Sequence, residues 1–102
     1  MSEDRIQRKD LVKKLSSIKR PKQWTESLER LGFRITSGGK HPYVARDPEN
    51  PNDSDIKSLV TTIPSHLHTV MNKIILKQVI SSPVTQRLGI TEDDIWSALG
   101  LG

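Results

Sequence analysis

Apolar and polar side chains alternate over residues 33–36, glycines follow, and a histidine opens the next short segment; this pattern constrains the fold more than any other. Residues 33–36 alternate apolar with polar side chains, which is typical of a half-buried strand. Residues 37–40 supply a turn, because glycine adopts positive φ values without steric cost. His41–Arg46 is the expected return strand, and Pro42 suits its start or an edge because proline lacks an amide donor. The pattern predicts a β-hairpin with a histidine directly after its turn.

Helices are expected on both sides of this hairpin. The spacing of apolar residues predicts helices over about residues 3–18, 22–31, 67–80 and 92–99. Residues 58–63 have a strand composition and follow a loop at 47–57 that is rich in Pro, Asn, Asp and Ser. Pro83 ends or kinks the third helix, and Thr91 caps the fourth, with Asp94 in a capping box. The inward face of the third helix is expected to carry Leu67, Val70, Met71 and Ile74.

This order of elements predicts the α+β class. The central α-β-β-β-α stretch is expected to form a three-stranded antiparallel sheet with helices on one face, an arrangement shared with double-stranded-RNA-binding domains. The organisation expected is a basic helical extension over residues 1–20, a core domain over 21–82 and a C-terminal helical extension over 83–102 that packs on the core. A length of 102 residues fits one domain with a modest core.

Composition narrows the classes of function. The chain has no cysteine, so it has neither a disulfide framework nor a thiolate metal site. No apolar run is long enough to span a bilayer, and the N-terminus does not resemble a secretory signal, so a cytoplasmic protein without a membrane partner is expected. Residues 1–22 carry a net charge of +5 and the remainder −1. The basic segment is either a surface for phosphate backbones or an acidic partner, or simply a solvated helix face.

Several short motifs follow one another in an informative order. They are Leu31-Gly32-Phe33, Gly39-Lys40-His41, Thr62-Ile63-Pro64-Ser65-His66, Ile75-Leu76-Lys77-Gln78 and an ending at 88–95. In this order they resemble the HicA family of small bacterial toxins, over about residues 22–80 and the C-terminal stretch. The chain departs from the family pattern in the basic segment that precedes the core and in Pro42 directly after the histidine.

The resemblance implies an mRNA interferase, an endoribonuclease of a toxin-antitoxin system. His41 is then the catalytic residue, and the partners are mRNA and a HicB-type antitoxin protein, with no metal and no small-molecule cofactor. Histidine suits proton transfer because its unperturbed pKa of about 6.5 is close to working pH. In cleavage without a metal, the 2′-hydroxyl of the RNA is the nucleophile, and His41 serves as general base or general acid.

Other polar residues are candidates for binding RNA. The glycines of the turn, Gly39 among them, let the RNA backbone approach closely, and Lys40 follows them. The remaining candidates are cations on the strands and the third helix and a histidine after the third strand: Arg34, Arg46, Lys73, Lys77 and His66. His66 is either a second acid or base, a substrate contact, or a structural residue, and His68 is expected at the surface. A metal site built from these histidines and His41 has little support, since no carboxylate spacing accompanies them.

Two other functions fit the same residues. The chain is alternatively a non-catalytic RNA-binding module of the same fold. It is otherwise an interaction protein that uses its first and last helices for protein contacts, the last through Ile90, Ile95, Trp96 and Leu99. The histidine in the glycine turn favours the nuclease over a pure backbone binder, for which lysine or arginine would be expected there.

Overall fold

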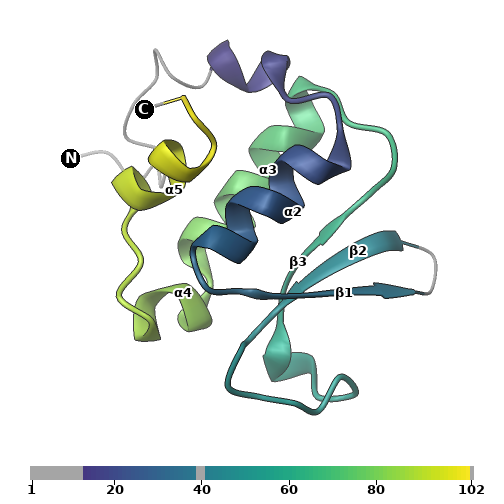
Figure 1. Ribbon diagram of the computed structural model, residues 1–102, viewed down its shortest axis with the longest axis vertical. Coiled ribbons are helices and arrows are strands. Elements are labelled where there is room, and N and C mark those ends of the chain that lie inside the picture. The colour runs from purple at the N-terminus through teal and green to yellow at the C-terminus, as the bar shows by residue number, and fades with distance from the viewer. Residues whose placement is uncertain (1–12, 39–40, 102) are drawn as a thin grey trace.

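A computed structural model describes residues 13–38 and 41–101 (Figure 1). In chain order its elements are η1 (Lys13–Ser17), α2 (Pro21–Arg30), β1 (Arg34–Gly38), β2 (His41–Arg46), η2 (Ile56–Ser58), β3 (Leu59–Ile63), α3 (Thr69–Ser81), α4 (Pro83–Arg87) and α5 (Glu92–Ala98), where η denotes a 3₁₀ helix. The three strands predicted from the sequence are present.

The strands form one antiparallel sheet in the order β1-β2-β3. Ile35 lies opposite Ala45, and Ala45 lies opposite Thr61, so the sheet is aligned through the middle of β2. Helices α2 and α3 both pack on the sheet (Figure 1), and the indole of Trp24 in α2 donates a hydrogen bond to Asn72 in α3. The prediction of an α+β fold with a three-stranded antiparallel sheet is confirmed.

Helix α2 begins and ends where the local sequence requires. Pro21 occupies its first turn, and the side chain of Gln23 accepts hydrogen bonds from the backbone amides of Lys19 and Arg20. At the other end Gly32 has a φ of +105°, and the amide of Phe33 donates to the carbonyl of Leu28 at 3.0 Å. This ending turns the chain directly into β1.

The buried face of α3 differs from the prediction. Ile75, Leu76 and Val79 point into the core, whereas Val70 and Ile74 are exposed, so the inward placement of Val70 and Ile74 was wrong. The reason is Asn72, a polar residue that is fully buried because its amide hydrogen bonds with α2 and the η1 segment. With Asn72 buried, the buried face of α3 differs from the face that the spacing of its apolar residues predicts.

The two ends of the described chain join the same core. The core cluster contains Leu15 of η1 and Ile18 directly after it, and Ile95 and Trp96 from α5. The predicted helix over residues 3–18 is described only from residue 13, where it is a 3₁₀ helix; residues 3–12 lie outside the described part. The division at residues 20 and 82 stays a prediction.

The C-terminal part contains one helix more than the sequence pattern predicts. Ser82 ends α3 and also caps α4, because its hydroxyl accepts a hydrogen bond from the amide of Val84 at 3.2 Å. The capping box of α5 is present as predicted: the hydroxyl of Thr91 accepts from the amide of Asp94, and the carboxylate of Asp94 accepts from the amide of Thr91.

Candidate functional site

The β1–β2 hairpin brings His41 to the turn. Gly38 pairs with His41 across the two strands, so only residues 39 and 40 connect them. The register shifts between Thr36 and Gly38, which marks an irregularity in β1 just before the turn. For His41 the structure describes the backbone, and Gly39 and Lys40 lie outside the described residues. The predicted roles of these three residues remain predictions.

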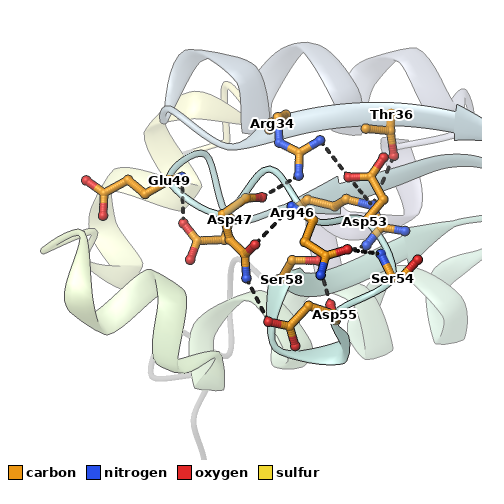
Figure 2. A network of polar contacts seen from close by, with 11 residues as sticks. Arg34, Thr36, Arg46, Asp47, Glu49, Asp53, Ser54, Asp55 and Ser58 are labelled. Carbon is orange, nitrogen blue, oxygen red and sulfur yellow. Dashed lines mark hydrogen bonds and ion pairs between the residues drawn. The ribbon is translucent and has the colours of Figure 1, made fainter.

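Arg34 and Arg46 are engaged with the loop between β2 and β3 (Figure 2). The guanidinium of Arg34 donates to the carbonyl of Asn50 at 2.6 Å and forms an ion pair with Asp53 at 2.8 Å. Arg46 donates from Nε to the hydroxyl of Thr36 at 3.2 Å and from Nη1 to the hydroxyl of Ser58 at 2.9 Å. Both arginines therefore already hold protein groups, and their predicted contacts with RNA would have to compete with these bonds.

The loop over residues 47–58 is ordered by its own short polar side chains. The side chains of Asp47, Asn50, Asn52 and Asp55 each accept a hydrogen bond from the backbone amide two residues further along. The bond from the amide of Lys57 is the main reason that the pKa of Asp55 is lowered, since it stabilises the charged carboxylate. Asx turns are readable from this composition, but the sequence interpretation identified only a loop.

A buried carboxylate links this loop to α4. Asp47 accepts a hydrogen bond from Nη2 of Arg87 at 2.5 Å, and the same nitrogen lies 3.3 Å from a carboxylate oxygen of Glu49. The hydrogen bond from Arg87 lowers the pKa of Asp47 despite the opposing effect of burial, and the amide of Glu49 adds to the shift. The pair fixes the loop against the helix that the sequence pattern missed.

A groove of about 650 Å³ lies between the loop and α4. Its lining includes the apolar side chains of Ile56, Leu59, Pro83 and Val84, together with Arg87. Of the predicted RNA-binding residues whose side chains the structure describes, none lines it. No local pattern in the sequence indicates this groove, because its two walls come from residues 47–59 and 82–87 and meet through Asp47 and Arg87, which are 40 residues apart in the chain.

The two other histidines have different places. His68 is exposed, as predicted, and caps α3 by accepting a hydrogen bond from the amide of Met71 at 3.3 Å. His66 is exposed in the segment between β3 and α3. In the described parts of the chain, no group of three or more histidine or carboxylate side chains is placed to hold a metal ion.

The predicted cations of α3 lie on its solvent side. Lys73 and Lys77 are exposed and stand one turn apart, with Val70 and Ile74 on the same side of the helix. Within residues 13–38 and 41–101, neither lysine takes part in an ion pair. A role in RNA binding for these two lysines stays a prediction.

Comparison with known proteins leaves the site to be argued from its own residues. No protein-family model matches the chain, and no curated protein sequence and no solved structure shows a significant match. Across the described residues, no helix combines the length and the apolar character needed to cross a membrane.

Proposed function

We propose that this chain is a HicA-like toxin, a metal-independent endoribonuclease that cleaves mRNA with His41 as general acid or base. The observation that supports this most is the hairpin in which Gly38 pairs with His41. Two residues of the chain connect these partners, and we place bound RNA beside His41 at this tip of the hairpin. The elements α2-β1-β2-β3-α3 would then be a core like that of double-stranded-RNA-binding domains, acting in the cytoplasm.

The chemistry requires few protein groups. The 2′-oxygen of the RNA attacks the adjacent phosphorus, the bond from phosphorus to the 5′-oxygen breaks, and the products are a 2′,3′-cyclic phosphate and a 5′-hydroxyl. His41 either accepts the proton of the 2′-hydroxyl or gives one to the departing 5′-oxygen. Gly39 permits close approach of the backbone, and Lys40 and His66 are proposed to contact phosphate. A HicB-type antitoxin would neutralise the enzyme by covering this tip.

Cleavage of a defined RNA in EDTA tests the proposal. The wild-type chain is expected to cut, and the His41→Ala variant is expected to lose at least about 10²-fold in rate, the lower range for one proton-transfer group. An RNA with a 2′-deoxy nucleotide at the cut should resist. His68→Asn is the matched control, because asparagine retains a helix cap while removing a histidine away from the hairpin.

The outcomes separate the two nucleic-acid functions. If the folded His41→Ala variant cuts as fast as wild type, the catalytic assignment is wrong. If neither protein cuts RNA but both bind it equally, the chain is a non-catalytic RNA-binding module.

A further inference from the structure

The outer side of α3 presents aliphatic and basic side chains together. Val70 and Ile74 stand one turn apart and expose 61% and 43% of their surface. Lys73 and Lys77 are also exposed. At 3.6 residues per turn, these four side chains fall within about 100° of the helix circumference. We name this set, Val70, Lys73, Ile74 and Lys77, the α3 stripe.

The α3 stripe lies away from the packed side of the helix. The opposite side of α3 carries the fully buried Asn72, Ile75, Leu76 and Val79, which join the helix to the core. Single exposed aliphatic residues are common on proteins and need no explanation. Here two of them lie one turn apart, flanked by two cations that have no ion pair among the described residues.

The mixture of side chains decides the kind of partner. Phosphate groups would pair with the two lysines but would leave Val70 and Ile74 against a charged backbone. A second copy of this chain, docked through the same surface, would bring lysine against lysine. An amphipathic protein segment satisfies all four side chains, because its aliphatic residues cover Val70 and Ile74 while its carboxylates meet the lysines.

We propose that the α3 stripe is a docking surface for an acidic amphipathic segment of a partner protein. This binding does not require that the chain cleave RNA. If the chain is a toxin, the antitoxin is the protein expected to supply the segment, and that identification rests on the proposed function.

A synthetic peptide tests the proposal on the whole chain. The probe carries leucines one helical turn apart flanked by glutamates, and its matched control has glutamine in place of every glutamate. Titration into ¹⁵N-labelled protein should shift the backbone NMR signals of Val70, Lys73, Ile74 and Lys77. The glutamate peptide should bind about tenfold more tightly than the glutamine peptide, and the difference should shrink in high salt.

Variants then separate the stripe from general charge attraction. Lys73→Gln with Lys77→Gln, and separately Ile74→Ser, should each weaken binding of the glutamate peptide about fivefold or more. Ile56→Ser and Lys57→Gln are matched controls, because Ile56 is 81% exposed and both residues lie on η2. These control variants should bind as wild type does.

Four results would overturn the proposal. The first is equal binding of both peptides, and the second is equal binding by wild type and the Ile74→Ser variant. The third is an absence of peptide shifts on α3 while an RNA oligonucleotide shifts the same signals, which would make the stripe an RNA surface. The fourth is that dilution alone shifts these signals, which would indicate self-association.

Discussion

Asn72 uses its side-chain amide to join three parts of the chain. Its Oδ1 accepts from Nε1 of Trp24 at 3.0 Å, and its Nδ2 donates to the carbonyls of Leu15 at 2.8 Å and Ile18 at 2.9 Å. The substitution Asn72→Ala leaves Nε1 of Trp24 and the carbonyl of Ile18 without this partner, at about 1–3 kcal/mol each, whereas the carbonyl of Leu15 still accepts from the amide of Ile18 at 3.1 Å. We therefore expect the free energy of unfolding to fall by at least about 2 kcal/mol in chemical denaturation.

The neighbouring exposed residue provides the control for this measurement. Lys73→Ala removes an exposed side chain from the same helix, and its effect should stay within about 0.5 kcal/mol. A decrease of less than about 1 kcal/mol in Asn72→Ala would mean that water or a shift of residues 13–18 satisfies Nε1 of Trp24 and the carbonyl of Ile18.

Asp47 makes stability depend on pH. Its pKa in the folded protein is lowered from the ordinary 3.8, first by the hydrogen bond from Arg87. A lowered pKa stabilises the fold above the unfolded value, and this stabilisation disappears as the pH falls through the folded value. We expect Asp47→Asn to be less stable than wild type at pH 7, with the gap narrowing below about pH 4.

Unfolding by urea at a series of pH values measures this gap. Asp53→Asn serves as the comparison, since it removes a half-exposed carboxylate from the same loop. A gap between wild type and Asp47→Asn that is constant with pH would show that Asp47 acts through its shape and hydrogen bonds rather than its charge.

At the scale of elements, Arg46 joins β2 to the middle of β1 and to the residue directly before β3. Its guanidinium reaches Thr36 of β1 and Ser58 of η2 from one rigid fork. Arg46→Lys keeps the charge but cannot make both bonds, so the free energy of unfolding should fall by about 1–2 kcal/mol. If Arg46 instead serves RNA as a simple charge, thermal unfolding of Arg46→Lys will match wild type and RNA affinity will be nearly unchanged.

The hydroxyl of Thr91 supplies one of the two hydrogen bonds of the capping box at the start of α5. Thr91 accepts a hydrogen bond from the amide three residues on at 3.2 Å, and the helix then buries Ile95 and Trp96. Thr91→Ala should lower the free energy of unfolding by about 1 kcal/mol, while Thr91→Ser should lower it much less. Equal decreases in both variants, measured by denaturant titration, would indicate that the methyl group of Thr91 matters rather than its hydroxyl.

Short sequence patterns predict the strands and helices of this fold better than they predict which face of each helix is buried. The alternation in residues 33–36 and the glycines after it predict a hairpin because both act between neighbours in sequence. The stretch 70–76 contains aliphatic residues on two different sides of the helix. The contact of Asn72 with Trp24, which lies 48 residues away in the chain, fixes which of these sides is buried. A pattern of apolar residues cannot report such a contact, so Val70 and Ile74 were placed inward.

In the candidate site, too, some features could be predicted from the sequence and others could not. The position of His41 beside a turn follows from sequence alone, and the hairpin is present as expected. The pairing of Arg34 and Arg46 with the 47–58 loop could not be predicted, because it depends on how that loop folds back over β1 and β2. A charged residue near a predicted site can bind substrate or can stabilise the fold through contacts with other protein groups. Only its neighbours in space show which of these two roles it has.

At the scale of the whole molecule, the positive charge is concentrated in one described segment. Residues 13–22 contain five cations and no carboxylate, and all five side chains are exposed: Lys13, Lys14, Lys19, Arg20 and Lys22. The segment is fixed to the core through the buried Leu15 and Ile18. It therefore presents its charges from a fixed place, as a surface for the RNA backbone requires.

We expect this segment to contribute most of the salt dependence of RNA binding. Lys13→Gln with Lys14→Gln should weaken binding of a single-stranded RNA, and the slope of log K against log salt should become shallower by about 0.7 for each phosphate that the variant no longer neutralises. Fluorescence anisotropy at several salt concentrations measures both quantities. Lys57→Gln removes an exposed cation elsewhere and should leave the slope unchanged. If the double variant keeps the wild-type slope, these lysines only solvate the surface, and RNA must be held by cations nearer the hairpin.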